Sequence, residues 1–319
     1  MLSKDGRCKT FDKSANGFAR GEGVGAILLK PLSQAQADGN PIYAVIRGTA
    51  ENHGGHAQSL TSPNPNAQAE LLIKAYEKAN ISPETVSYFE AHGTGTSLGD
   101  PIEINGLKKA FAALYQKWGL DTIKTPHCGL GSVKTNIGHL ESAAGIAGVL
   151  KVLLMMQHKT LPATLHLKEL NPYIELQDSP FYIVDSERAW EPLYDDHGQA
   201  IPRRAGVSSF GFGGSNGHVV LEEYPQSAMD TSSGPQIIVL SAKNADRLTA
   251  YAKKLATFLK QPSPPALANI AWTLQTGREA MEERLALVVD SLEQLTEKLA
   301  ILRSQIHTLK STILINRTS

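Results

Sequence analysis

The stretch that decides the fold runs from residue 90 to residue 101 and reads Glu-Ala-His-Gly-Thr-Gly-Thr-Ser-Leu-Gly-Asp-Pro. The segment just before it, 86–89, is typical of a strand. At its end, Asp100 can cap a helix, Pro101 suits the first helical position and Glu103 completes a capping box. A strand, a glycine-rich loop and a capped helix in succession indicate a layered α/β fold.

The same alternation continues on both sides of this stretch. Apolar runs predict further strands, and apolar residues at helical spacing predict further helices. The helix expected at 142–157 is apolar nearly all round, so we expect it to be buried. We expect strands at 24–29, 42–46, 204–209 and 218–222, and helices at 66–80, from Asp100 to Leu114, and at 142–157.

A linker divides the chain. Residues 225–235 read PQSAMDTSSGP, a short stretch that is rich in small residues. Beyond it the pattern predicts a second, smaller α/β module, whereas residues 304–319 carry no clear pattern. In this module we expect strands at 236–240 and 285–289 and helices at 246–260 and 292–302.

Composition excludes several classes of protein. The 319 residues contain 31 Lys plus Arg and 31 Asp plus Glu, so the net charge is zero and nucleic-acid binding is not favoured. The most apolar stretch, 146–156, is interrupted by Lys151 and is too short for a membrane span. Residues 1–12 lack the apolar run of a signal peptide. We therefore expect a cytoplasmic protein without a membrane span.

The two cysteines, Cys8 and Cys128, lie far apart and form no CxxC pair. Their spacing gives no support to a disulfide framework or a zinc site. We expect both thiols to be reduced and no metal to be bound.

Two glycine-framed histidines are candidates for chemistry. His92 lies in the loop described above, where glycines let the backbone approach a ligand closely. Residues 129–142, GLGSVKTNIGHLES, place Lys134 and His139 just ahead of an expected helix. This segment is not a phosphate loop, because Val133 stands where that loop needs glycine. A single histidine is more often structural, but two in such surroundings favour a site.

A third segment, 208–218, reads SSFGFGGSNGH and holds four glycines between two expected strands. One use of such a backbone is an oxyanion site made by a peptide N–H group. A glycine-rich hairpin without chemistry is the alternative, and the segment alone favours the hairpin.

Taken together, the motifs carry a specific resemblance. The segments EAHGTGTSLGDPIE, GSVKTNIGHLESAAGIAG and SSFGFGGSNGHVVLEE, in that order, resemble β-ketoacyl synthases, particularly the ketosynthase domains of modular polyketide synthases. The opening GRCKTFDKSANGFARGEGVGAILLKPL is similar to the same family. Residues 236–319 are similar to the adaptor that follows these ketosynthases.

The resemblance implies the C-terminal half of a thiolase-like layered fold, followed by a small α/β adaptor module. It divides the chain into the end of the ketosynthase N-terminal half (1–41), the C-terminal half (42–224), the linker (225–235) and an incomplete adaptor (236–319).

The resemblance also implies an activity, that of an acyltransferase of the β-ketoacyl synthase type. Such enzymes condense a cysteine-bound acyl group with a carrier-bound malonyl extender that loses carbon dioxide. By matching motifs, His92 and His139 are the catalytic histidines and Lys134 is the lysine that supports them. Thr94 and Thr96 match the threonines that contact the phosphopantetheine arm.

Phe212 matches the gating phenylalanine whose backbone N–H completes an oxyanion hole. Neither Cys8 nor Cys128 matches the family's nucleophile, so this chain holds no nucleophile and we expect the isolated chain to be inactive. The implied partners are acyl carrier protein domains, which carry the phosphopantetheine, and the missing ketosynthase half. No cofactor is bound directly, and the complete enzyme is expected to be a homodimer.

Two other classes compete with this interpretation. The absence of a nucleophile and the retained adaptor are also typical of a non-catalytic scaffold or docking module in a megasynthase. A fatty-acid condensing enzyme is the third alternative, and the adaptor-like region argues for the polyketide type.

Overall fold

The computed structural model describes residues 1–55, 62–120, 125–225 and 234–305. The chain divides into two compact units, Met1–Gln226 and Ser227–Ser319. Each has its own hydrophobic core.

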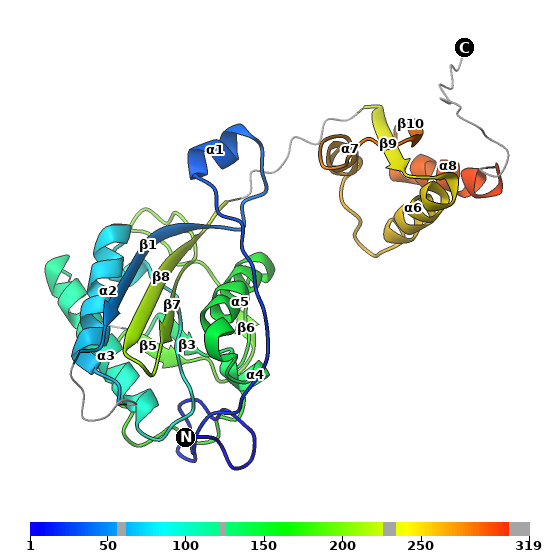
Figure 1. Cartoon of the computed structure of the whole chain (residues 1–319). Helices are drawn as coiled ribbons and strands as arrows, with labels where there is room; N and C mark the ends of the chain where they lie inside the picture. Colours follow the sequence, from blue (N-terminus) through cyan, green and yellow to red (C-terminus); the bar gives the residue numbers. More distant parts are fainter. Residues whose placement is uncertain (56–61, 121–124, 226–233, 306–319) are drawn as a thin grey trace. The chain divides into compact units, whose positions relative to one another are not determined.

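The first unit is built on a mixed six-stranded sheet (Figure 1). One side of the sheet is antiparallel, and the four strands from β7 to β5 are parallel. In spatial order the strands are β1 (Ala44–His53), β8 (Ser215–Glu223), β7 (Arg204–Phe210), β2 (Tyr88–Glu90), β3 (Cys128–Gly131) and β5 (Phe181–Ile183). The strands β4 (Thr160–Leu161) and β6 (Arg188–Ala189) form a separate pair.

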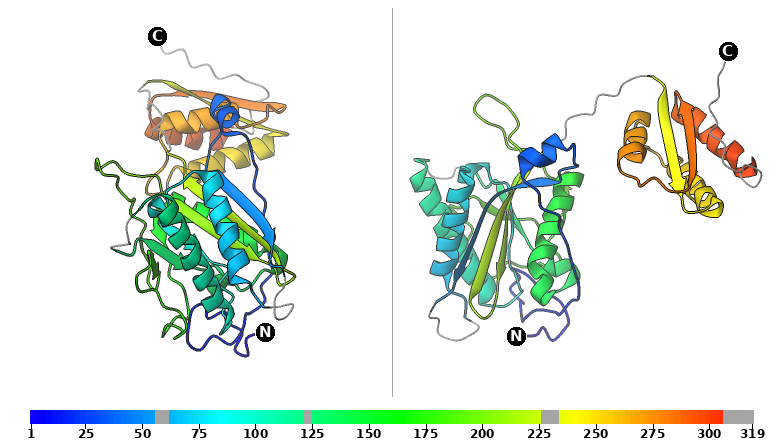
Figure 2. Two further views of the ribbon diagram at one scale, coloured as in Figure 1. Left: turned by 90° about the vertical axis from the view of Figure 1, so that its left-hand side faces the viewer. Right: turned by 45° about the horizontal axis from the view of Figure 1, so that its top comes forward.

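Helices cover both faces of this sheet, which confirms the predicted α/β layering (Figures 1 and 2). The helices α2 (Pro65–Ala79) and α3 (Gly99–Lys117) lie on one face, and α5 (Ala144–His158) lies on the other. The core under α2 and α3 includes Tyr76 and Phe111, and the core under α5 includes Val152 and Trp190. The shorter helices are α1 (Leu32–Ala37), η1 (Pro83–Thr85), α4 (Lys134–Ile137) and η2 (Glu141–Ala143).

The helix expected at 66–80 forms as α2 because its signals are local. Oδ1 of Asn64 accepts the backbone N–H groups of Asn66 and Ala67, and Pro65 occupies the first turn. The helix ends at Asn80, which has a left-handed backbone conformation.

The capping roles predicted for Asp100 and Glu103 at the start of the next helix are wrong. The helix α3 begins at Gly99, and no side chain caps it. The carboxylates of Asp100 and Glu103 are not a cap and a capping box. They accept backbone N–H groups of the preceding loop and of Phe11 instead. The N–H groups of the folded loop and of Phe11 take these acceptors in place of the helix N-terminus.

The strand expected at 24–29 does not form. Residues 22–30 are extended, but their backbone groups make no hydrogen bond to any part of the chain that the structure describes. The side chains of Val24 and Leu28 are each 97% exposed. A strand needs a neighbour for its hydrogen bonds, and the described residues provide none here.

The expectation that residues 142–157 are buried on all sides is also wrong. The helix α5 packs Gly148, Val152 and Met156 against the sheet, but Leu154 on its outer side is 55% exposed. An apolar sequence shows that a helix face can be buried, not that this chain buries it.

Within the described residues 234–305, the second unit has two antiparallel strands and three helices. The hydrophobic core lies between them and includes Leu240, Leu287 and Leu295. One helix, α7, was not predicted; no side chain caps its first turn. The elements are β9 (Gln236–Ala242), α6 (Ala245–Phe258), α7 (Leu267–Thr276), β10 (Glu283–Val289) and α8 (Leu292–Gln305).

Candidate active site

His92 lies on the loop that follows β2, with its imidazole half-buried. Its Nδ1 accepts the backbone N–H of Phe210 at 3.2 Å, and the Phe210 ring lies 5.7 Å from the imidazole, centroid to centroid. Because Nδ1 is an acceptor, the ring proton is on Nε2.

His139 follows α4 and precedes η2, and it too is half-buried. Its Nδ1 accepts the backbone N–H of Glu141 at 2.9 Å, and its own backbone N–H donates to the carbonyl of Ala19 at 2.7 Å. The same reasoning places its ring proton on Nε2. The structure therefore gives both histidines the same tautomer.

The structure brings these two histidines together from separate elements. Their ring centroids lie 5.4 Å apart, with an angle of 84° between the planes. Burial lowers the pKa of His92 well below its usual value, and the neighbouring Lys134 charge lowers it further. Burial and the same charge also lower the pKa of His139. Both imidazoles are thus neutral at pH 7, and each has one N–H donor.

Lys134 begins α4 and is only 3% exposed. Burial lowers the pKa of its ammonium group, while the carboxylates of Glu90, Glu103 and Asp100 raise it. The lysine therefore interacts electrostatically with two neutral histidines and three acidic side chains.

Two buried carboxylates shape the loop that carries His92. Glu103 accepts the N–H groups of His92 and Gly93 at 2.7 and 2.8 Å. Asp100 accepts those of Gly95 and Phe11 at 3.1 and 2.9 Å, and burial raises its pKa to about 6. At Gly95 φ is +77°, and an added Cβ would lie 2.7 Å from the backbone nitrogen of Lys9, so a larger residue does not fit.

Thr94 and Thr96 lie on the same loop, both half-buried, with their hydroxyl oxygens 3.4 Å apart. Oγ1 of Thr96 also accepts the N–H of Gly99 at 3.2 Å. These two hydroxyls are half-buried polar groups on the loop that follows His92.

Phe212 projects from the turn between β7 and β8 and is 69% exposed. This turn is tied to the end of β1, because Gly54 N–H donates to Gly214 O at 2.7 Å and His53 Nε2 lies 3.1 Å from Gly213 O. An added Cβ at Gly214, where φ is +95°, would lie 2.6 Å from His53 Nε2. His53 thus packs directly against the turn that carries Phe212.

Neither thiol of the chain resembles an activated nucleophile. Sγ of Cys8 accepts the N–H of Ala19 at 3.2 Å, and Cys128 lies in the buried strand β3. Burial raises the pKa of both thiols, whereas a reactive cysteine has a lowered pKa and is accessible.

Sequence reasoning missed the acidic side chains and His53. The available signal was the clustering of Glu90, Asp100 and Glu103 around a glycine-rich loop, but several of their partners, Phe11, Val133 and Lys151, lie far along the chain. Within the described ranges, no group of three or more His, Cys, Asp or Glu side chains could hold a metal ion. In the same ranges, no helix is long and apolar enough to cross a membrane.

Three family models match the chain. Residues 1–35 match the model described as "Beta-ketoacyl synthase, N-terminal domain", and residues 43–168 match "Beta-ketoacyl synthase, C-terminal domain". Residues 239–305 match "RhiE-like, KS-MAT linker domain".

Similar proteins and structures agree with these matches. Polyketide synthase PksN of Bacillus subtilis is 57% identical over 308 residues, which cover 93% of this chain and 6% of that protein. Polyketide synthase ThaG of Burkholderia thailandensis is 46% identical over 311 residues, covering 94% and 5%. The oxazolomycin ketosynthase domain OzmH KS7 of Streptomyces albus superposes with a TM-score of 0.83 at 44% identity, covering 95% of this chain and 52% of that one. The ketosynthase from module 6 of the Bacillus subtilis bacillaene synthase superposes with a TM-score of 0.81 at 44% sequence identity. The match covers 96% of this chain and 51% of that one.

The fold is therefore that of the thiolase-like condensing enzymes, with a mixed sheet between helical layers. Within this class, residues 1–35 and 43–168 match the β-ketoacyl synthase models, and the chain resembles the C-terminal half of a polyketide-synthase ketosynthase domain, followed by its linker. The chain spans about half the length of the solved ketosynthases and a much smaller share of the curated relatives.

Proposed function

We propose that this chain supplies the decarboxylation and condensation side of a polyketide ketosynthase site. Loss of carbon dioxide from a malonyl thioester leaves an enolate, whose oxygen needs hydrogen-bond donors. The observation that carries the proposal is the pair of neutral imidazoles, His92 and His139, 5.4 Å apart, each with Nδ1 occupied by a backbone N–H. Each then has an Nε2–H free to donate to the enolate oxygen, and one can also move a proton.

Lys134 supports this role through its charge. The Lys134 side chain is buried, and its charge lowers the pKa of both histidines. It keeps the imidazoles in the neutral form that donates from Nε2, and it favours negative charge developing on the substrate.

The proposed substrates arrive on a phosphopantetheine arm carried by an acyl carrier protein. The hydroxyls of Thr94 and Thr96, on the loop that follows His92, are suited to hydrogen bonds with the amides of such an arm. Phe212, exposed on its glycine-rich turn, is the proposed gate, and its backbone N–H is the proposed donor to the acyl thioester.

The thiol nucleophile must then come from a second ketosynthase half. The unpaired segment 22–30, with Val24 and Leu28 exposed, lies beside an apolar pocket of about 470 Å³ that also includes Ile146 and Leu150 of α5. An open strand edge next to an apolar surface suits the addition of a strand and a core. We propose that the cysteine-bearing half packs there, and that the isolated chain is inactive.

The same proposal includes the division of the chain into 1–41, 42–224, 225–235 and 236–319, a cytoplasmic location and a homodimer in the complete enzyme. The alternative is a non-catalytic scaffold or docking module. It is favoured by the buried, high-pKa thiols and by the separate core of the second unit.

The test combines the full chain with a ketosynthase half that bears the cysteine. Mass spectrometry of the acyl-cysteine measures loading, and release of carbon dioxide with formation of the β-keto thioester measures condensation. We expect His139→Ala to reduce condensation by about 10²-fold or more, because an oxyanion donor is lost, and to reduce loading far less.

The matched control is His197→Ala, which removes an exposed imidazole from a surface turn and should leave both steps unchanged. Equal losses of loading and condensation in His139→Ala would refute the assigned role. Full function of both His92→Ala and His139→Ala would instead support the scaffold.

A further inference from the structure

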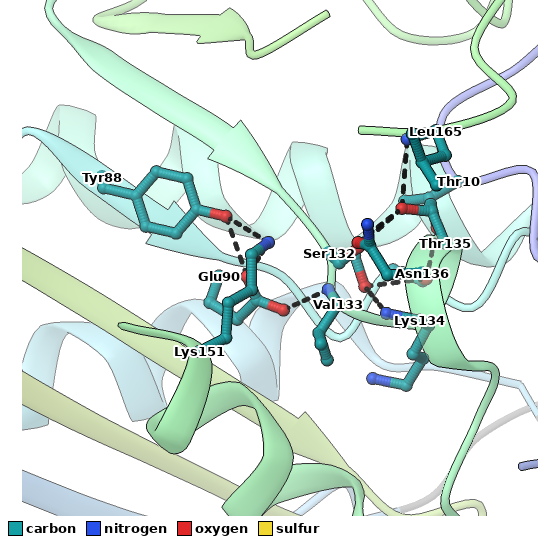
Figure 3. Close-up of polar contacts among 11 residues, drawn as sticks. Thr10, Tyr88, Glu90, Ser132, Val133, Lys134, Thr135, Asn136, Lys151 and Leu165 are labelled. Atoms are coloured by element: carbon teal, nitrogen blue, oxygen red, sulfur yellow. Dashed lines mark hydrogen bonds and ion pairs between the residues drawn. The ribbon is translucent and has the colours of Figure 1, made fainter. Parts of the chain in front are cut away.

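A buried polar cluster formed by Tyr88, Glu90 and Lys151 lies beside the site and has no part in the chemistry proposed for the histidines (Figure 3). Glu90 ends strand β2, two residues before His92, and Lys151 comes from α5. The side chains of Glu90 and Lys151 are only 2% and 10% exposed. Burying such a pair is costly unless every polar atom is satisfied, so each of its contacts matters.

Both oxygens of the Glu90 carboxylate are engaged. Oε2 accepts the hydroxyl of Tyr88 at 2.8 Å and the ammonium group of Lys151 at 2.7 Å. Oε1 points the other way and accepts the backbone N–H of Val133 at 2.5 Å. The carboxylate therefore bridges the helix α5 and the turn that precedes Lys134.

The helix α5 packs closely against Glu90 and the neighbouring strand at this point. At Gly148, one turn before Lys151, an added Cβ would lie 3.2 Å from Cγ of Glu90 and 3.0 Å from Cγ1 of Val207. The bare helix surface at Gly148 lets α5 pass directly over the carboxylate. Lys151 then reaches across the Tyr88 ring, with Nζ 5.4 Å from the ring centroid.

The turn that receives this hydrogen bond is fixed along its length. After Val133, the N–H of Lys134 donates to Ser132 Oγ at 3.4 Å, and Thr135 Oγ1 donates to Ser132 O at 3.0 Å. Thr135 Oγ1 also accepts the N–H of Leu165 at 3.1 Å. Figure 3 shows Glu90 on one side of this turn and the Lys134 side chain emerging from it.

We propose that Glu90 is a positioning residue for Lys134: its carboxylate holds the turn through the Val133 amide and keeps the buried Lys134 side chain cationic. Lys151 competes with Lys134 for the same negative charge. This inference relies on the proposed function only for the role of Lys134 in the reaction.

The charges around Lys134 support this assignment. The titratable groups that interact electrostatically with it are Glu90, Glu103, Asp100 and the Cys8 thiol, together with His92 and His139. Burial lowers the Lys134 pKa, and Glu90 is the strongest of the charges that raise it. Burial raises the pKa of Glu103 and Asp100. The Glu90 carboxylate accepts three hydrogen bonds, from Tyr88, Val133 and Lys151.

The test is an NMR titration of the Lys134 side chain in the full chain with isotope-labelled lysine, with the signal identified by its loss in Lys134→Met. Glu90→Gln keeps the shape but removes the charge, so the Lys134 pKa should fall by about one unit or more. Lys151→Met removes the competing cation, so the Lys134 pKa should rise. The titration needs no catalytic activity, so its outcome is separate from that of the proposed function.

The opposite expected changes of the Lys134 pKa in Glu90→Gln and Lys151→Met distinguish a positioning role from structural support alone. If the pair only held the fold together, both substitutions would loosen the site and move the Lys134 pKa the same way, which would overturn the proposal. An unchanged Lys134 pKa in Glu90→Gln would also overturn it. The matched control is Glu223→Gln, which breaks the partly buried pair with Arg203 elsewhere in the sheet and should leave Lys134 unchanged.

A second variant keeps the test valid if Glu90→Gln fails to fold. The double variant Glu90→Gln/Lys151→Met leaves no unpaired buried charge and should regain stability. It should still show a lowered Lys134 pKa, because the negative charge remains absent. A parental pKa in this double variant would contradict the proposal.

Discussion

At the scale of single residues, His218 shows how this fold holds a polar group in its core. The imidazole is 1% exposed and stacks on Phe89, with ring centroids 5.3 Å apart. Its Nδ1 lies 2.9 Å from Ser208 Oγ, while Nε2 has no hydrogen-bond partner among the described residues. Burial lowers the pKa of His218 to about 3, so the ring is neutral in the folded protein.

This histidine makes the stability of the first unit depend on pH. Below pH 6.5 the unfolded chain protonates His218 but the folded chain does not, so stability falls as pH drops toward 3. The contribution reaches about 1.4 kcal/mol per pH unit. Asp100 acts in the opposite direction, because its raised pKa favours the folded state at low pH.

We expect His218→Gln to flatten the loss of stability between pH 6.5 and 4. The measurement is urea unfolding of each variant at several pH values, and the difference from the parent protein isolates the His218 contribution. His197→Gln, on the exposed turn, should leave the pH dependence unchanged. A parallel pH dependence in His218→Gln and the parent protein would argue that the ring is already protonated in the folded state.

At the scale of elements, sequence signals succeed where their partners are local. For α2, the cap, the proline and the apolar face all lie within 64–80, and the helix forms where it was expected. For α3, the sequence predicts the helix but assigns Asp100 the wrong partner, because Phe11, whose N–H its carboxylate accepts, lies 89 residues away. The residue type indicates an acceptor, but only the tertiary structure shows which N–H groups it accepts.

The cap of α2 gives a prediction at this scale. Asn64→Ala removes the acceptor for two N–H groups and the donor to Gly54 O, so it should destabilise the first unit by about 1–2 kcal/mol. The measurement is the free energy of unfolding in urea. At the other end, Asn80 has φ of +50°, which glycine adopts easily, so Asn80→Gly should be nearly neutral. Equal losses from both substitutions would contradict the capping argument.

At the scale of the whole molecule, the sequence predicts the layers and singles out the two histidines that the structure brings together, but it does not predict which surfaces stay open. Alternating strands and helices predict an α/β fold whatever other segments pack against them. The pairing of 24–29 and the burial of α5 depend on what lies against them, which a local pattern does not contain. Accordingly, the segment is extended but unpaired among the described residues, and α5 keeps an apolar outer side.

Segment 22–30 and the apolar outer side of α5 form an exposed face whose role can be tested by substitution. Val24 and Leu28 are almost fully exposed, so Val24→Thr/Leu28→Thr removes no packing and should change the free energy of unfolding by less than about 0.5 kcal/mol. The same variant should bind less of a hydrophobic dye and self-associate less, because it shortens an apolar edge. It should also capture the cysteine-bearing ketosynthase half more weakly in a binding titration.

Leu71→Thr is the matched control, because Leu71 lies on the buried face of α2 and is 1% exposed, so its substitution should lower stability and raise dye binding. If the double variant on segment 22–30 behaved like Leu71→Thr, the segment would be part of the folded core. If it kept full stability and full affinity for the other half, this face would not be the docking surface. If segment 22–30 is a docking surface, the double variant should keep the free energy of unfolding of the parent protein and should bind the cysteine-bearing half more weakly.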